Sequence, residues 1–166
     1  MPFLEIITYP NPILRKIAEP VKNVTDEIIN LSKNMVERMY LAHGAGLAAN
    51  QVGVSLRLIV LDLQLKKDNK PIVVINPSII DKDPEEISEE EGCLSVPKYY
   101  DYVKRSKKVS VQGMTLEGKA FEMECEGHMA RAFQHEIDHL NGIVFIDYLS
   151  PVKKHLFKKQ YLKNEK

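Results

Sequence analysis

The first regular pattern of apolar positions along the chain lies between residues 28 and 39. Apolar residues recur there at intervals of three and four, which is the spacing of one face of an α-helix. Asn23 or Thr25 can cap this helix, and Asp26 and Glu27 follow in the first turn, where the helix dipole favours acids. The pattern stops at HGAGLAANQVG, whose three glycines are unfavourable in a helix. We therefore predict a helix that begins near residue 25 and ends before this stretch.

The next segments have the patterns of strands. LRLIVLDL at 56–63 and PIVVINP at 71–77 are rich in β-branched and aliphatic residues, which is typical of buried strands. KKVSVQGMT and KAFEMECEG are predicted to be a later pair joined at LEGK. In the second of these, Phe121, Met123 and Cys125 alternate with glutamates, so one face of the strand is predicted to be buried. Cys125 is therefore interpreted as a core residue.

Helical spacing returns from residue 128 to about residue 142. Met129, Phe133, Ile137 and Leu140 share one face of this segment. The predicted fold class is α+β, with mainly antiparallel sheets around this helix, an N-terminal helix and a C-terminal helix. The acidic segment 81–91 has seven acids and one lysine, and we expect a solvated loop there, apart from Glu91.

The last segment of the chain is basic. Six lysines and one glutamate lie between residues 153 and 166. Val152, Leu156, Phe157 and Tyr161 are interspersed among them, so a helix here is predicted to be basic and amphipathic.

Length and composition fit one domain. The chain has 166 residues, and we expect a single catalytic domain at 1–150, with the helix at 151–166 belonging to it. A net charge of zero argues against a chain that binds DNA by charge alone. The N-terminus does not resemble a signal peptide, and no apolar run approaches about 18 residues, so no membrane anchor is expected. Two cysteines do not indicate a disulfide framework, and we expect a cytoplasmic protein.

The candidate chemistry lies in HEIDH, residues 135–139. His135 and His139 are one helical turn apart, so both imidazoles can reach one metal ion. Glu136 is adjacent to the first of them and is placed to act as general base on water. The alternative is a pair of surface histidines beside a solvated glutamate, and a third ligand decides between the two.

Two common protease continuations of this motif fail. In HExxHxxGxxH the last ligand would be at Phe145, which cannot bind a metal. The other continuation needs a glutamate downstream, and the acids after His139 are Asp147 and Glu165. The third ligand is therefore predicted upstream, at Cys93 in EEEGCLSVP. One cysteine and two histidines leave a position open for water, which is typical of a catalytic site.

Three stretches together resemble the motifs of the peptide deformylase family. They are GAGLAANQ at 44–51, EGCLS at 91–95 and HEIDH at 135–139, in the family's order and at plausible spacing. The likeness extends from YPNPILR to GIVFIDYLSP, which is nearly the whole chain. The resemblance implies an enzyme that removes the N-terminal formyl group from formylmethionine of nascent polypeptides and releases formate.

The resemblance also implies roles for individual residues. Cys93, His135 and His139 would hold the metal, which is Fe(II) in the cell, with Zn, Ni or Co able to substitute. A hydroxide on the metal would attack the formyl carbon, with Glu136 as general acid/base. Two further groups, the Gln51 side chain and the backbone N–H of Leu94, would stabilise the oxyanion.

Further positions bear on the substrate. The backbone near Gly44 and Gly46 would pair with the substrate peptide. Tyr100 stands where relatives often have glycine or a basic residue, and it either contacts substrate beyond the methionine or is an exposed loop tyrosine. His128 either lines the methionine pocket or lies at the start of the helix, and a metal role is disfavoured because three ligands suffice.

Arg105 and the C-terminal tail are the last positions to which the resemblance assigns a role. Arg105 matches a recurrent arginine of the family and would pair with Glu91 or Asp138, or lie on the surface. The C-terminal helix docks on the ribosome in bacterial relatives, so the ribosome is a candidate partner besides formylmethionyl nascent peptides. The competing functions are an HExxH metallopeptidase and a ribosome-binding protein with a degenerate site. No DNA or membrane partner is expected.

Overall fold

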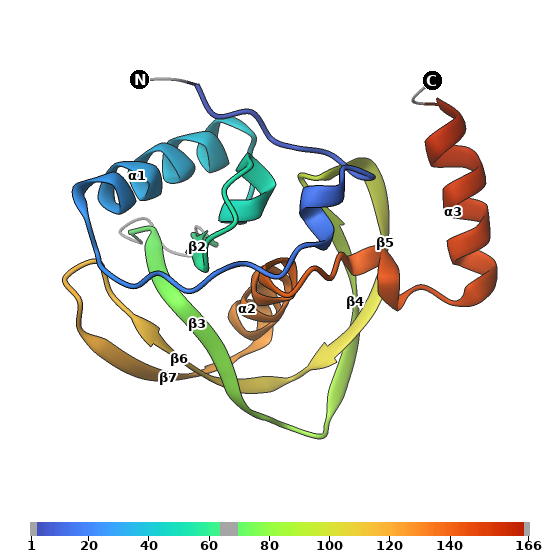
Figure 1. Ribbon diagram of the computed structural model, residues 1–166. Helices are drawn as coiled ribbons and strands as arrows, with labels where there is room; N and C mark the ends of the chain where they lie inside the picture. The colour runs from blue at the N-terminus through green and yellow to red at the C-terminus, as the bar shows by residue number, and fades with distance from the viewer. Residues whose placement is uncertain (1–2, 64–69, 165–166) are drawn as a thin grey trace.

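The computed structural model describes residues 3–63 and 70–164, which form three α-helices and seven strands. Five strands make one antiparallel sheet, and two make a separate hairpin. Helix α2 (Gly127–Leu140) lies between them, and helix α3 (Pro151–Asn164) lies beside the hairpin (Figure 1). Helix α1 (Asp26–Leu41) packs against Leu58 and Val60 of the sheet, whereas α2 packs against the alternate residues Ile59 and Leu61. The α+β prediction is confirmed.

Helix α1 begins where its cap predicted. Thr25 is the N-cap, and its hydroxyl accepts a hydrogen bond from the backbone N–H of Ile28 at 3.4 Å. Ile28, Met35 and Met39 are buried, and they pack against strands and loops of the sheet. This packing supports the segment after the helix, which carries the first motif.

The five-stranded sheet has the order β1-β2-β3-β6-β7, and β1 is an edge strand. Both of the early predicted strands and the later pair are present. The alternation in β7 is confirmed, because Cys125 is buried while Glu122, Glu124 and Glu126 are exposed. The strands are β1 (Gly46–Ala48), β2 (Leu58–Leu61), β3 (Ile72–Lys82), β6 (Lys108–Met114) and β7 (Ala120–Glu126).

The expected loop in the acidic segment is wrong. Its start belongs to β3, and its end forms β4 (Glu86–Cys93), which pairs in antiparallel fashion with β5 (Val96–Ser106). β4 has little apolar patterning because half of its residues are exposed and only one is buried. Backbone pairing with β5 and the buried carboxylate of Glu91 hold it instead. Tyr100 therefore lies on a strand and not on a loop.

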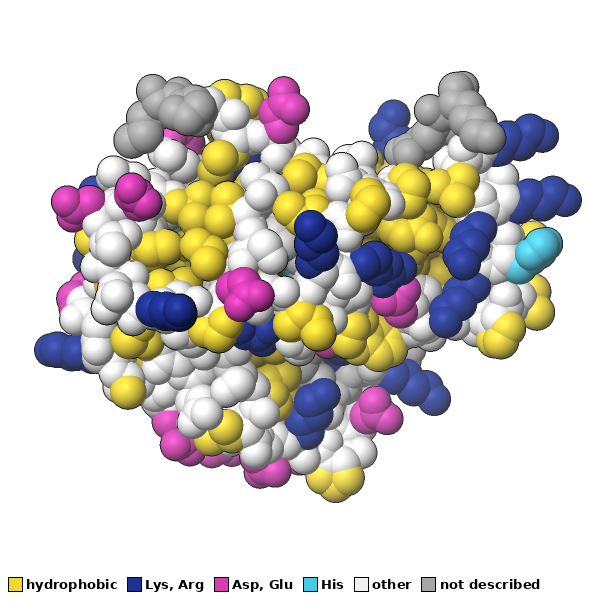
Figure 2. All heavy atoms as spheres, in the orientation of Figure 1, with side chains coloured by type: hydrophobic (Ala, Val, Ile, Leu, Met, Phe, Trp, Pro, Cys, Tyr) yellow, Lys and Arg dark blue, Asp and Glu magenta, His cyan; other side chains and the backbone are white. Residues whose placement is uncertain are grey.

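Helix α3 packs on the body through fewer residues than its sequence predicted. The ring of Phe157 is buried, and it contacts Tyr9 and Tyr99 with ring centroids 5.8 and 4.6 Å away. Val152 and Leu156 are exposed, because only one narrow side of the helix meets the domain. Lysine side chains stand along its outer side (Figure 2). Within the described residues, the helices are all too short or too polar to span a membrane.

Candidate active site

Three potential metal ligands meet between the hairpin and helix α2. Cys93 ends β4, and His135 and His139 project from α2 one turn apart. One ligand atom from each lies within 4.8 Å of the others. The Sγ atom of Cys93 and the Nε2 atom of His139 are 3.2 Å apart. A thiol and two imidazoles converging in this way are a donor set suited to a divalent transition metal.

The carboxylate of Glu91 orients His135. Its Oε1 atom lies 2.9 Å from the Nδ1 atom of His135, so Nε2 is the ring nitrogen left to face the other ligands. Arg105 donates from Nε and Nη2 to the two Glu91 oxygens at 2.9 Å each, as a bidentate pair. Burial alone would raise the pKa of Glu91, but the hydrogen bonds from Arg105 and His135 hold it well below its usual value.

Arg105 pairs with both of the carboxylates that were expected as alternative partners, Glu91 and Asp138. Besides Glu91, its Nη1 atom donates to Asp138 at 2.5 Å, and its guanidinium is only 4% exposed. The ring of Tyr148 covers the guanidinium, 4.8 Å from centroid to Cζ, and its hydroxyl donates to Asp138 at 2.7 Å. Arg105 is therefore part of the support of the site and not a surface residue.

The two histidines have opposite electrostatic surroundings. Burial lowers the pKa of His135, but hydrogen bonds to Cys93 and Glu91 raise it by more. Burial, together with the positive charges of His135 and Arg105, lowers the pKa of His139 well below its usual value. A lowered pKa favours the neutral imidazole of His139, which is the form that binds a metal.

Glu136 is buried beside the ligands. Its side chain is surrounded by α2 and β1, and burial raises the pKa of this carboxyl to about 7. Its Oε2 atom has no hydrogen-bond partner among residues 3–63 and 70–164. A Cβ atom on Gly46 would lie 2.6 Å from Oε1 of Glu136, so only glycine permits this approach of β1 to the carboxylate. An unpartnered buried carboxyl of this kind is suited to proton transfer.

The orientation of the Gln51 amide follows from its contacts. Its Oε1 atom accepts from the backbone N–H of Ala48 at 2.9 Å, so its amide hydrogens point the other way. Nε2 donates to the hydroxyl of Ser95 at 3.0 Å and lies 3.5 Å from the Sγ atom of Cys93. The amide therefore presents a donor at the ligand cluster. Leu94, the other predicted oxyanion donor, follows Cys93 in the turn between β4 and β5.

A pocket of about 600 Å³ opens over this cluster. The structure brings all the predicted site residues to it or to its edge, except that His139 lies beneath it. The ring of Tyr100 covers Gly92, and a Cβ atom there would lie 2.5 Å from the ring. His128 is at the start of α2, exposed at the pocket rim and outside the ligand cluster.

Several supporting residues were not predicted. Asn50, which the first motif treats as a variable position, is fully buried and donates to the backbone carbonyl of His139 at 2.5 Å. Ser95 holds Gln51, and Arg131 contacts Glu91 at 2.6 Å. The position of Arg131, one helical turn before His135, was the one signal available in the sequence.

Phe145 stands at the position where the HExxHxxGxxH pattern would supply its third metal ligand, and it has a structural role instead. Its ring is 1% exposed and stacks near His135, with ring centroids 6.2 Å apart. Phe145 belongs to the buried hydrophobic cluster against which Cys93 packs. A helix-borne HExxH pair with an upstream cysteine, a buried glutamate and an amide donor defines the class as a metal-dependent hydrolase.

Comparisons with known proteins identify the family. Residues 3–155 match the sequence profile of polypeptide deformylase. A peptide deformylase of Acinetobacter baumannii is 51% identical, over 93% of this chain and 87% of its own length. One from Syntrophobacter fumaroxidans is 50% identical, over 100% and 98%. The crystal structure of a peptide deformylase from Legionella pneumophila superposes with a TM-score of 0.91 at 43% identity, covering 99% of this chain and 96% of that one.

The chain therefore belongs to the polypeptide deformylase family. It is a metal-dependent enzyme that acts on formylated nascent peptides and removes their N-terminal formyl group.

Proposed function

We propose that Cys93, His135 and His139 hold the metal and that Glu136 is the general acid/base of deformylation. The observation that carries this assignment is the convergence of three donor atoms within 4.8 Å of one another, beside a buried carboxyl with an unpartnered oxygen. The donor set fits a divalent metal with an open position for water. When bound, the ion supplies positive charge for the formyl oxygen and a water of lowered pKa.

The protein's own groups move the proton. Glu136 accepts a proton from the attacking water on its free Oε2 atom. A carboxyl with a pKa near 7 both takes this proton and returns it to the nitrogen of the departing amine. Negative charge develops on the formyl oxygen as the water attacks the formyl carbon, before the C–N bond breaks, and the Nε2 donor of Gln51 and the backbone N–H of Leu94 stabilise it.

Replacing Gln51 with alanine is expected to lower kcat by about 10²–10³-fold, as for other oxyanion donors. The amide is fixed by Ala48 and Ser95, so it is oriented before substrate binds. The measurement is formate release from formyl-Met-Ala-Ser. Ser95→Ala is the matched control, because it removes one contact of the amide but keeps the donor, and its loss should be smaller. Wild-type turnover in Gln51→Ala would contradict the role.

The substrate peptide is proposed to extend strand β1. β1 is an edge strand, and an extended chain can pair with the outer side of such a strand by β-augmentation, apart from the N–H of Ala48, which already donates to Gln51. Gly44 and Gly46 would lie along this edge, packed against the side chains of Leu94 and Glu136 respectively. The methionine side chain would enter the pocket, with His128 lining its rim and Tyr100 contacting the substrate beyond the methionine.

The metal is proposed to be Fe(II) in the cell, with Zn, Ni or Co able to take its place. A ferrous ion and a thiolate ligand are both open to oxidation. We expect activity to decay in air for protein loaded with iron and to persist for protein loaded with nickel. The two preparations are compared by formate release over time, and equal decay would contradict the proposal.

Helix α3 is proposed to contact the ribosome. The enzyme is proposed to work in the cytoplasm. Helix α3 is also proposed to belong to the single catalytic domain formed by residues 1–150. The lysines on its outer side suit phosphate-rich RNA (Figure 2). Truncation after Ser150 is expected to reduce co-sedimentation with ribosomes. Unchanged co-sedimentation of the truncated chain would refute this contact.

A further inference from the structure

Arg131 links the hairpin to helix α2 at the site. It lies on α2, and its side chain is 12% exposed. Nη2 donates to the backbone carbonyl of Ile87 at 2.6 Å, and Nη1 donates to that of Val103 at 2.9 Å. These carbonyls belong to β4 and β5, so one guanidinium ties both strands to the helix.

The same guanidinium reaches the carboxylate that orients His135. Nη1 of Arg131 donates to Oε2 of Glu91 at 2.6 Å. The other oxygen, Oε1, contacts His135, which is one turn further along the same helix. The Glu91 carboxylate is therefore attached to α2 at two points, one through each oxygen.

The contacts of Glu91 divide evenly between its oxygens. Oε1 accepts from Arg105 and contacts His135, while Oε2 accepts from Arg105 and Arg131. A carboxylate has about four lone-pair positions, so this arrangement leaves none unused. Arg105 reaches the carboxylate from β5 and is itself held to α2 through Asp138, whereas Arg131 donates to the carboxylate directly from the helix that carries the ligands.

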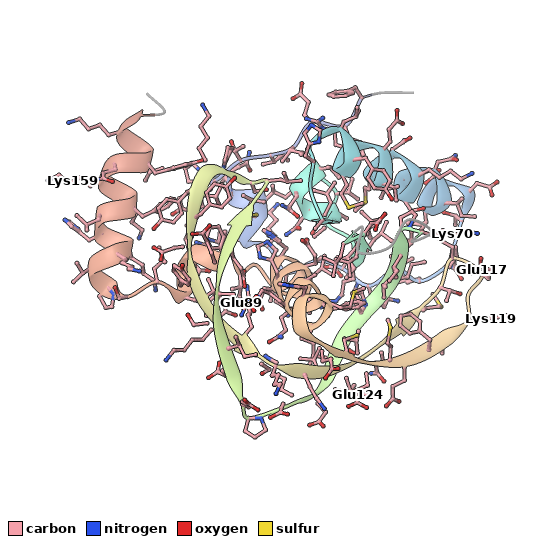
Figure 3. The ribbon with its side chains drawn as sticks, turned by 180° about the vertical axis from the view of Figure 1, so that it is seen from behind. Lys70, Glu89, Glu117, Lys119, Glu124 and Lys159 are labelled. Atoms are coloured by element: carbon pink, nitrogen blue, oxygen red, sulfur yellow. The ribbon has the colours of Figure 1, made fainter. Side chains whose placement is uncertain are left out.

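We propose, on the basis of the metal site proposed above, that Arg131 is a positioning residue, which holds Glu91 against His135 and so directs that ligand toward the metal. Groups that orient a metal-bound histidine typically contribute about 10–100-fold to metal affinity. Nη1 and Nη2 are both occupied, and Nε lies 3.4 Å from Glu89 of β4, beside the start of α2 (Figure 3). The head group is thus occupied by groups of the protein, and Arg131 contributes to the pocket wall without being a catalytic residue.

The test is Arg131→Met, which keeps an unbranched apolar chain at the pocket wall and removes every donor. Gln134→Met is the matched control. Gln134 also ties α2 to β5, by donating to the carbonyl of Ser106 at 2.9 Å and accepting from its N–H at 3.1 Å, but it makes no contact with Glu91. Both variants lose a tether between helix and strand, and only one loses a contact to the carboxylate.

Three properties of the full-length proteins are measured: the Kd for Co(II), the visible absorption spectrum of the Co(II) form, and Tm without metal. We expect Arg131→Met to bind Co(II) about 10–100-fold more weakly, with a changed spectrum. Gln134→Met is expected to keep the Kd and the spectrum, while Tm falls in both. Equal losses of Tm with wild-type Kd and spectrum in both would overturn the proposal and leave Arg131 a purely structural tether.

A second variant covers misfolding. If Arg131→Met fails to fold, Arg131→Gln replaces it, since its amide retains a hydrogen-bond donor for the strands, and the same two outcomes decide. A wild-type protein that binds no Co(II) would instead refute the metal site proposed for Cys93, His135 and His139, so the two failures are distinguishable.

Discussion

Glu136→Gln is expected to lower kcat for formate release by about 10²–10⁴-fold, the usual contribution of a general acid/base. The substitution keeps the size of the side chain and removes its ability to take a proton. Glu136 is 5% exposed and its Oε1 atom lies against Gly46, so a side chain of equal shape fits the same space. KM should change little, because the carboxyl acts on the proton and does not hold the peptide.

The same variant makes a separate prediction for stability. The pKa of Glu136 is raised to about 7 by burial, so its folded state favours the protonated form. A raised carboxyl pKa contributes stability below the unfolded pKa, and this contribution is lost as pH rises through about 7. At pH 8, without metal, Glu136→Gln should therefore unfold at a Tm no lower than that of the wild type. Full activity, or loss of activity only through unfolding, would contradict the assigned role.

Arg105→Met is expected to destabilise the fold by about 3–5 kcal/mol, because it leaves Asp138 without its cation and leaves buried Glu91 with Arg131 alone of its two arginines. Glu91 is 6% exposed and Asp138 is 17% exposed. In a chain of this size the loss corresponds to a fall in Tm of roughly 6–20 °C. Urea unfolding of the metal-free protein gives the free energy directly.

Arg15→Met is the control for Arg105→Met. Arg15 also pairs with an aspartate, Asp147, at 2.6 Å, but its side chain is 41% exposed. An exposed pair contributes at most about 1 kcal/mol, so this variant should be far less destabilised. Equal losses of unfolding free energy in the two variants would show that burial does not determine how much the Arg105 ion pairs stabilise the fold.

The elements that could be predicted from the sequence are those whose side chains alternate between core and water. β7 and α1 are of this kind, because burial of Cys125 and Met35 imposes a visible period. β4 was missed because it is held by pairing with β5 and by the ion pairs of buried Glu91, neither of which leaves a hydrophobic period. A run of acids alone does not distinguish such a strand from a solvated loop.

The metal ligands of the site could be predicted from the sequence, but the residues that hold those ligands in place could not. The spacing of His135 and His139, and the exclusion of downstream ligands, led to Cys93 from the sequence alone. The contacts of Asn50 and Arg131 join residues 89 and 40 positions apart, to His139 and Glu91 respectively. No local pattern encodes contacts over such separations, so the support of the ligands required the structure.

Formate release and bound metal, measured together in the wild type and in Cys93→Ala, test the proposed metal site and its reaction most directly. Both proteins are loaded with one metal and given formyl-Met-Ala-Ser. For the wild type we expect one formate per peptide, intact peptide bonds and one metal per chain. For Cys93→Ala we expect no retained metal, and no more formate than in a reaction without enzyme. A Cys93→Ala protein that retains both, or a wild type that cleaves the peptide bonds, would contradict the assignment.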